Sequence, residues 1–442
     1  MSTPPTDGAP SPLTRDQLVA AFHSYGTPRE GWRVGGEFER ALVHADGRPV
    51  GYSDPRGIRW VLERLAADGW RPEFEGDNPI ALYKDGASIT LEPGGQVELS
   101  GAPHRRLADL AAEAAANRAA LRELVADGDL TWIAAGLTPI ADIDDIEWVP
   151  KGRYVVMREY LPLFGDLAHF MMKGTCSVQA NFDYADEADC ARKVRLAAGL
   201  APLTTALMAN SPLYRNQPTG FKSYRAHIWT RTDPSRTGFP RALREQYTHE
   251  GWVDYLLDVP MMFYKVDGEW LPARGRSFRV YMEQGFDGHR PGPDDWALHQ
   301  TSVFPEVRVK HTIEIRGADC VDHDLAIAFC ALWTGLMYCP QALADGLDLV
   351  AELGREGTAM ERFAAAARGG LDGVVSGRPL SEWARELGVI AERGMRRCMP
   401  DDLPLLDPLL ARIDAGRCPA DDLLDAWRAD PSPEAIIRQV AY

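Results

Sequence analysis

Several features that would assign a common function class are missing from this chain of 442 residues. The seven cysteines include no C-x-x-C pair, which argues against a zinc site. Their odd number and irregular spacing fit a reducing compartment better than a disulfide scaffold. Neither a P-loop of the form G-x-x-x-x-G-K-[ST] nor a G-x-S-x-G nucleophile elbow occurs. The sequence therefore gives no sign of a P-loop nucleotide site or of a serine hydrolase.

Long apolar runs and excess positive charge are also missing. The formal net charge is −16, which disfavours nucleic acid or an anionic membrane as a general partner. No apolar run approaches the roughly 20 residues of a membrane-spanning helix. Residues 1–12 are polar and proline-rich, without the basic and apolar regions of a signal peptide. We expect a cytoplasmic protein with a short disordered leader over 1–12. We also expect that the protein acts on small molecules and is a monomer or a homodimer.

The sequence does contain a mixture of alternating and helical patterns. Alternation predicts strands over 32–44, 131–139, 176–183 and 305–316, and two short strands over 87–100. Helical patterns cover 54–67, 106–126 and 186–209, and the capping box from Thr14 to Gln17 opens an earlier helix. This mixture predicts an α+β fold, an antiparallel sheet with helices packed on it. We expect one main domain over 13–340 and a helical C-terminal region over 341–442 packed on it.

Acidic residues recur on the predicted strands. Glu37 and Glu39 are two residues apart, so both carboxylates point to one strand face, roughly 7 Å apart along the chain. Such a pair can bind a hard cation such as magnesium, although an isolated E-x-E is more often a solvated strand face. Glu92 and Glu98 flank a Pro-Gly-Gly turn and read as a charged hairpin by themselves. Their apolar neighbours argue instead for half-buried carboxylates, which need a partner such as a shared metal ion.

Glu314 and Arg316 form a third polar element, with isoleucines on the opposite strand face. The simple interpretation is a salt-bridged surface pair that contributes little. The functional interpretation is a metal ligand beside an arginine whose planar fork binds two phosphate oxygens. Five acids on three strands with one arginine thus indicate a magnesium-dependent site and leave nucleotide use open.

Seven segments, in the same order along the chain, resemble the plant and proteobacterial type of glutamate–cysteine ligase. This type is a branch of the glutamine-synthetase-like carboxylate–amine ligases. The segments are Leu91–Pro103, Pro150–Tyr154, Ala209–Pro212, Arg225–Trp229, Leu257–Pro260, Phe304–Arg308 and Glu314–Asp319. The resemblance covers roughly residues 33 to 338, whereas 341–442 matches only in its general helical character. It implies a funnel of antiparallel sheet flanked by helices, with the active site at the mouth.

The resemblance also implies a reaction that uses ATP and Mg²⁺. ATP phosphorylates the γ-carboxylate of glutamate, the amine of cysteine attacks the acyl phosphate, and γ-glutamylcysteine is formed for glutathione biosynthesis. The implied metal ligands are Glu37, Glu39, Glu92, Glu98 and Glu314, with Gln179 where related branches place a histidine. Arg316 is the implied catalytic residue, Arg225 the arginine that holds the substrate glutamate, and Tyr160 a residue that helps to line the acceptor pocket.

The sequence departs from this family pattern at a few positions. Lys173 and Gly174 stand where related sequences usually carry an aromatic residue or leucine and then arginine, and the segment from Cys320 to Asp324 is not glycine-rich. These departures leave open a ligase of the same fold that joins glutamate, or another acid, to a different amine in a specialised pathway. A non-catalytic relative that binds metal or nucleotide is the third interpretation. The complete set of acids argues against it.

Overall fold

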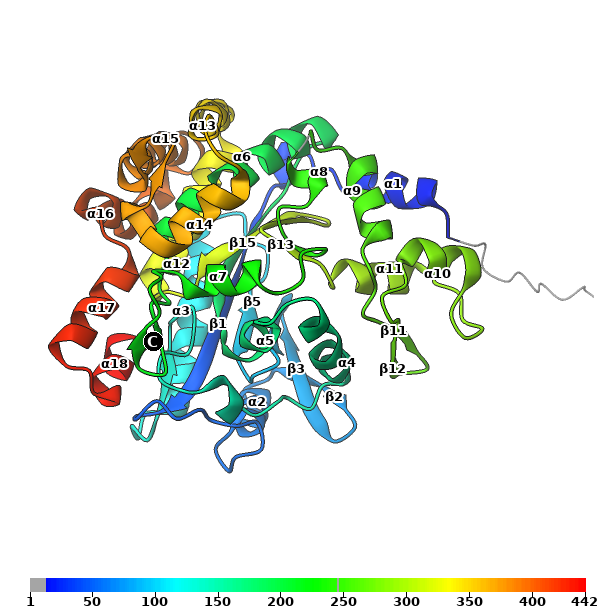
Figure 1. Cartoon of the computed structure of the whole chain (residues 1–442), viewed down its shortest axis with the longest axis horizontal. Helices are drawn as coiled ribbons and strands as arrows, with labels where there is room; N and C mark the ends of the chain where they lie inside the picture. Colours follow the sequence, from blue (N-terminus) through cyan, green and yellow to red (C-terminus); the bar gives the residue numbers. More distant parts are fainter. Residues whose placement is uncertain (1–12, 245) are drawn as a thin grey trace, which may run out of the picture.

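A nine-stranded sheet lies at the centre of the described chain, residues 13–244 and 246–442 of the computed structural model (Figure 1). The strand order is β14-β15-β7-β1-β5-β4-β3-β2, and β6 pairs with β1 outside this path. Neighbouring strands are antiparallel, and their bounds are β1 Val34–His44, β2 Arg71–Glu75, β3 Asn78–Lys84, β4 Ala87–Leu91, β5 Val97–Ser100, β6 Leu130–Ile133, β7 Ser177–Phe182, β14 Val307–Val309 and β15 Ile313–Asp319. The leader predicted over 1–12 lies outside the described residues.

Most of the predicted strands are confirmed, and one is wrong. The alternating pattern over 305–316 was read as a single strand, but the structure divides it into β14 and β15. The two strands form a hairpin, in which Lys310 N donates to Thr312 O. The turn residues, Lys310, His311 and Thr312, include neither glycine nor proline. The apolar residues on either side, Val309 and Ile313, keep the same even spacing, so the pattern hides the reversal. The hairpin β2–β3 was not predicted, since its first strand, Arg-Pro-Glu-Phe-Glu, shows no apolar alternation.

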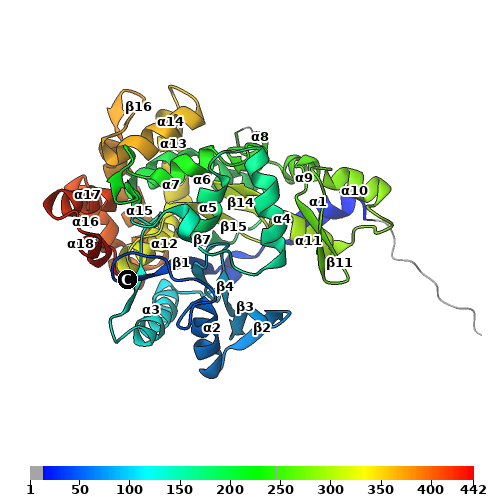
Figure 2. The ribbon, with the colours of Figure 1, turned by 60° about the horizontal axis from the view of Figure 1, so that its bottom comes forward.

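Helices pack on both sides of the sheet and continue into the C-terminal region (Figure 2). Helix α12 is buried along most of its length and packs on β7 and β1, and α3 also packs on β1. The helices are α1 Arg15–Ser24, α2 Ile58–Ala67, α3 Leu107–Leu124, α4 Gly152–Tyr160, α5 Ala168–Gly174, α6 Glu187–Leu207, α7 Tyr224–Thr230, α8 Arg241–Arg244, α9 His249–Asp258, α10 Phe278–Gln284, α11 Pro293–Gln300, α12 His323–Tyr338, α13 Pro340–Leu353, α14 Ala359–Gly369, α15 Leu380–Cys398, α16 Asp407–Ala415, α17 Pro419–Ala429 and α18 Pro433–Gln439. The predicted α+β architecture with a helical C-terminal region is confirmed.

Local sequence signals account for several helix ends. The predicted capping box at Thr14 is present at the start of α1, and Asp186 caps α6 by accepting from Asp189 N. Short strand pairs complete the fold: β8 Leu213–Tyr214 with β9 Gln217–Pro218, β10 Thr237–Gly238 with β13 Phe304–Pro305, β11 Phe263–Val266 with β12 Glu269–Pro272, and β16 Val374–Val375 with β17 Arg378–Pro379. Among the described residues no single helix has the length and hydrophobicity of a membrane span, although α12 and α13 would pass together as a pair bent by 98°.

The back of β1 is held by residues that are far away in the sequence. Arg40 is 1% exposed, and its guanidinium lies 4.0 Å from the ring centroid of Tyr442. Arg40 Nη1 donates to Cys320 Sγ at 3.0 Å and to the main-chain oxygen of Glu39 at 2.5 Å. Tyr442 is fixed in turn, because its N–H donates to Trp132 O on β6. The strand that carries Glu37 and Glu39 is therefore clamped from behind.

Candidate active site

One cavity of about 250 Å³ opens on the face of the sheet that carries the predicted acids. Strands β1, β4, β5, β7, β14 and β15 supply its floor, and α4, α5 and α7 supply its walls. Its lining residues include Glu37, Glu39, Glu92, Glu98, Gln179, Arg225 and Arg316, all of them predicted from the sequence. The structure thus brings together seven of the nine predicted site residues, which come from segments up to about 280 positions apart.

Strand pairing places the four acids side by side. Glu39 on β1 lies directly opposite Glu98 on β5, and Glu37 lies opposite Gln179 on β7. Directly opposed residues of an antiparallel pair have Cβ atoms about 4.5–5.5 Å apart, so side chains on the same face interact. Glu92 joins them from the turn between β4 and β5, where its N–H donates to Gln96 O. The four carboxylates therefore form one acidic end of the cavity.

The acids raise one another's affinity for protons. Burial, and then the charge of Glu92, raises the pKa of Glu39 to about 7, despite a hydrogen bond that its carboxylate accepts from Ser177 N at 2.5 Å. Burial, followed by the charges of Glu37 and Glu92, raises the pKa of Glu98 well above its usual value. Carboxylates that share a site cannot all ionise without compensation. The acidic end therefore favours protons or a metal cation. Within residues 13–244 and 246–442, no three Asp, Glu, His or Cys side chains already form a metal-binding group.

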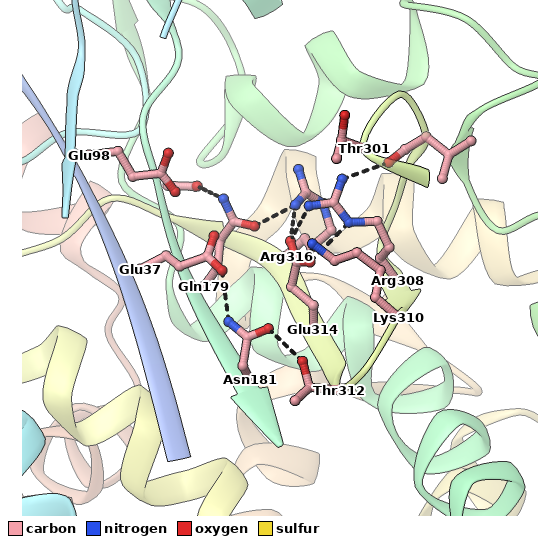
Figure 3. Close-up of polar contacts among 12 residues, drawn as sticks. Glu37, Glu98, Gln179, Asn181, Thr301, Arg308, Lys310, Thr312, Glu314 and Arg316 are labelled. Atoms are coloured by element: carbon pink, nitrogen blue, oxygen red, sulfur yellow. Dashed lines mark hydrogen bonds and ion pairs between the residues drawn. The ribbon is translucent and has the colours of Figure 1, made fainter. Parts of the chain in front are cut away.

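The opposite end of the cavity is cationic and is organised by one buried carboxylate (Figure 3). Glu314 accepts from Arg308 Nε at 2.9 Å and Nη2 at 2.8 Å, contacts Lys310 Nζ at 3.2 Å, and also accepts from Arg316 Nη1. Burial alone would raise the pKa of Glu314, but Arg308, Lys310 and Arg316 together hold it well below its usual value. Two of these cations, Arg308 and Arg316, line the cavity. A pair of guanidinium groups fixed in this way can bind phosphate oxygens.

Glu314 itself lies behind the cavity surface. It was predicted beside the other acids, but it is 0% exposed and is absent from the cavity lining. Its neighbour Gln179, predicted to offer an amide oxygen to a metal, uses this oxygen to accept from Arg316 Nη1 at 2.6 Å. Gln179 Nε2 donates to Ser177 Oγ at 3.1 Å and reaches Glu39 Oε1 at 3.4 Å. Gln179 thus links the acidic end of the cavity to the cationic end.

Arg225 projects into the cavity from α7. It is 4% exposed, and its Nη2 donates to the main-chain oxygen of Arg316 at 3.1 Å. Its Nη1 lies 3.9 Å from Asp319, which is held by Asn210 N and by the hydroxyls of Ser211 and Ser223. The segments Ala209–Pro212 and Glu314–Asp319 therefore meet at Arg225. A buried guanidinium with one weak ionic contact suits an anionic substrate group.

Tyr160 does not belong to the cavity. It ends α4, and its ring packs against Phe164 and beneath the Arg236 guanidinium, which lies 5.6 Å from the ring centroid. Tyr154 and Met157, earlier on the same helix, do line the cavity. At a rise of about 1.5 Å per residue, Tyr160 lies roughly 9 Å beyond Tyr154 along the helix axis. Tyr160 is therefore absent from the lining of this cavity, and its role in the acceptor pocket stays a prediction.

Sequence reasoning missed three cationic lining residues. Lys151, Arg153 and Arg308 belong to segments that carried the family resemblance, but no role was attached to them. Burial, followed by the charge of Arg153, lowers the pKa of Lys151. The one sequence signal for a functional role of these three residues was their position in segments that match the family. By itself, a lysine or an arginine outside a phosphate-binding motif is usually a solvated surface residue.

Comparisons with known proteins agree on one family. The model of the family described as glutamate–cysteine ligase family 2 (GCS2) matches residues 33–441. A chloroplastic glutamate–cysteine ligase of Brassica juncea is 35% identical over 459 residues, which cover 100% of this chain and 87% of the relative. Its counterpart in Nicotiana tabacum is 35% identical over 452 residues, with 100% and 86% covered. A crystal structure of a Francisella tularensis glutamate–cysteine ligase in complex with AMP matches with a TM-score of 0.57 and 14% identity, over 92% of this chain and 87% of that one. This likeness shows the fold alone.

Proposed function

The chain belongs to glutamate–cysteine ligase family 2, and we propose that it joins the γ-carboxylate of glutamate to the amine of L-cysteine. The γ-carboxylate takes the terminal phosphoryl group of ATP, and ADP leaves. The cysteine amine then attacks the acyl phosphate, loses a proton and releases inorganic phosphate, so that γ-glutamylcysteine remains. The predicted family is confirmed by the match over 33–441 and by full-length relatives at 35% identity.

The observation that carries this proposal is the division of one cavity into an acidic and a cationic end. ATP-dependent acyl activation needs a metal site for the polyphosphate and cations around the transferred group, more than it needs a nucleophilic side chain. Glu37, Glu39, Glu92 and Glu98 supply the first requirement, and Arg308 and Arg316 supply the second. Gln179 connects the two ends through hydrogen bonds.

The acidic end fits magnesium in its donor chemistry. The donors are carboxylate oxygens, which hard cations prefer, and their mutual repulsion, seen in the raised pKa of Glu39 and Glu98, would be relieved by a divalent ion. Glu37, Glu39, Glu92 and Glu98 would hold the ion. When bound, magnesium draws charge away from the phosphate oxygens of ATP. The roles of Glu314 and Gln179 as metal ligands stay predictions, because both contact arginine in this structure.

The remaining groups bind and orient the substrates. Glu314 locks Arg308 and Arg316 into fixed directions, so their donors need no reorganisation as charge develops on the transferred phosphoryl group. Arg225 holds a carboxylate of the substrate glutamate. Positioning glutamate, ATP and amine in one partly enclosed cavity supplies much of the remaining rate enhancement and excludes water from the acyl phosphate.

The wall of the cavity suits a small apolar side chain on the acceptor. Met157, Met171 and Met172 line it together with Trp229 and Phe304. Methionine sulfur is soft and polarizable, and the flexible side chain can adapt to a thiol. Lys173 and Gly174, where the sequence departs from its family, do not line the cavity, and the Lys173 ammonium lies 5.1 Å from the ring centroid of Trp148. Neither departure therefore places a side chain in the lining of this cavity.

The experiment that tests this function measures phosphate release from ATP with magnesium and glutamate, across a panel of amines that includes cysteine. Product masses are recorded for each reaction. Cysteine-stimulated release with a mass of γ-glutamylcysteine is the expected result. Turnover with a different amine alone would contradict cysteine as the acceptor and move the enzyme to another pathway. Silence with every amine would contradict the ligase activity with glutamate.

A further inference from the structure

A buried carboxylate that the proposed reaction does not use lies next to Arg225. Glu306 stands between β13 and β14, and strand alternation puts it on the same side as Phe304 and Arg308, which both line the cavity. It is 6% exposed. Its N–H donates to Gly238 O at 2.9 Å, and its carbonyl accepts from Arg316 N at 3.1 Å. The main chain therefore fixes Glu306 beside the cavity, and its side chain lies behind Phe304 and Arg308 rather than in the lining itself.

The neighbouring strand is shaped to admit this side chain. The register of β15 against β7 shifts between Ile315 and Ala318, a bulge that contains Gly317. A Cβ atom at Gly317 would lie 2.4 Å from Glu306 Oε2 and 3.6 Å from Thr205 Oγ1. Glycine thus leaves the space that the carboxylate occupies, and a larger residue here would push the Glu306 side chain aside. Bulges of this kind are common beside active sites, where they redirect side chains.

Despite this tailored space, the carboxylate lacks a hydrogen-bond donor. Glu306 Oε2 is buried and has no partner among the described residues. Burying a carboxylate oxygen without a donor is costly. The nearby Asp319 is different, because Asn210 N and the hydroxyls of Ser211 and Ser223 all donate to it. Of the two buried acids beside Arg225, Asp319 is satisfied by the protein and Glu306 is not.

The charges around Glu306 restrict what could satisfy it. Burial raises the pKa of Glu306 to about 7, and the largest opposing influence is the charge of Arg225, followed by that of Arg316. A divalent metal would be repelled by these two guanidinium groups, and a phosphate would be repelled by the carboxylate. An ammonium group on a molecule that also carries a carboxylate avoids both kinds of repulsion. The ammonium group can donate a hydrogen bond to Glu306, and Arg225 can bind the carboxylate.

We propose that Glu306 and Arg225 together form a subsite for the α-amino acid group of the donor substrate. Arg225 binds the α-carboxylate, and Glu306 accepts a hydrogen bond from the α-ammonium group. Arg225 turns from the main-chain oxygen of Arg316 onto the substrate, and this movement exposes the Glu306 carboxylate to the ammonium group. The proposal rests on the proposed function, in which glutamate is the acyl donor. It makes the α-ammonium group of glutamate necessary for recognition of the substrate.

The test compares L-glutamate with glutarate, which has both carboxylates but no amino group. The ratio of kcat/KM for glutamate to kcat/KM for glutarate is measured at saturating Mg-ATP and cysteine. In the Glu306→Gln variant this ratio should fall about ten- to a hundredfold, the typical worth of a hydrogen bond to a charged group. In Glu306→Asp, where the charge remains but is retracted by one methylene, the ratio should be intermediate, and this variant is decisive if the amide variant folds poorly.

The control is Asp402→Asn, which neutralises a buried acid that pairs with Arg106 and Leu107 N away from the cavity. It should keep the wild-type ratio. An equal loss for glutamate and glutarate in Glu306→Gln would overturn the proposal, because Glu306 would then act on structure alone. A change confined to the KM of cysteine would also overturn it and would assign Glu306 to the acceptor. Failure of the underlying ligase function would show differently, as absence of turnover in the unmodified protein.

Discussion

Glu306 should make the stability of the metal-free protein fall as the pH rises, and the Glu306→Gln variant should remove this dependence. Burial raises the pKa of this carboxyl from 4.5 to about 7. Below pH 4.5 the group is protonated in both the folded and the unfolded state, so it contributes nothing. Between pH 4.5 and about pH 7, Glu306 keeps its proton in the folded state but has lost it in the unfolded state. The free energy of unfolding therefore decreases with pH.

The size of the effect follows from the displacement of the pKa. A shift of about 2.5 units at about 1.36 kcal/mol per unit gives a loss of about 3 kcal/mol by pH 8. The isosteric amide does not titrate, so the difference in unfolding free energy between Glu306→Gln and the unmodified protein should grow by about 3 kcal/mol from pH 4.5 to pH 8. The difference cancels the titration of the other carboxylates, provided that they respond equally in the two proteins.

Urea unfolding at pH 4.5, 6, 7 and 8, with EDTA present and the ionic strength held constant, measures this difference. EDTA is needed because metal binding to the acidic end would add its own pH dependence. The variant Glu123→Gln, at an exposed position on α3, removes the same formal charge and should run parallel to the unmodified protein. Parallel curves for Glu306→Gln as well would refute the reasoning, since Glu306 would then be ionised and fully paired in the folded state.

Three further predictions concern the site and the clamp behind it. Glu39→Gln should lower magnesium-dependent ATP turnover at least about a hundredfold, since the loss of even an outer partner of a metal ligand costs about 10–100-fold. An unchanged circular dichroism spectrum would verify that the Glu39→Gln variant is folded. Near-normal turnover would contradict the role of Glu39 in metal binding. Arg225→Ala should raise the KM of glutamate far more than the KM of ATP, and equal changes would remove Arg225 from the glutamate site. Tyr442→Ala should lower the free energy of unfolding by about 2 kcal/mol or more, because a buried cation–π contact with Arg40 is lost. Tyr442→Phe keeps the ring and should stay close to the unmodified protein, and equal losses in the two variants would disprove the role of the ring.

The sequence predicted those parts of the fold whose physical signals are local. Strand alternation located β1 and β7, and cap chemistry located the starts of α1 and α6. The reversal between β14 and β15 could not be predicted, because its turn, Lys310 to Thr312, contains neither glycine nor proline and the apolar residues of the two strands keep the same even spacing across it. The hairpin β2–β3 was missed because its first strand is largely polar and exposed.

The sequence predicted those features of the site that depend on which strand face a residue occupies and on the order of the family segments along the chain. Period-two spacing placed Glu37 and Glu39 on one face, and the order of the family segments brought in Arg225. The depth of each residue was not predictable, because it depends on packing from distant elements. Glu314, expected beside the other acids, therefore lies behind the cavity surface. Tyr160, expected to help line the acceptor pocket, is not among the residues that line this cavity. Glu306 lies in the matching segment Phe304–Arg308, but the sequence pattern assigns it no role, since the surroundings of its carboxylate include a bulge on the neighbouring strand.

The clamp behind β1 has a consequence for how the protein folds. Residues 34–44 emerge early in synthesis, but their partners on the buried side include Cys320 and Tyr442, roughly 280 and 400 positions later. Contacts between such distant residues close slowly, because the entropy of the intervening chain is lost before the contact forms. The strand that carries the acids should therefore acquire its final rigidity among the last events of folding. A nascent chain that lacks residue 442 would hold Arg40 without its aromatic partner, so catalytic competence should emerge only when almost the entire described chain is present.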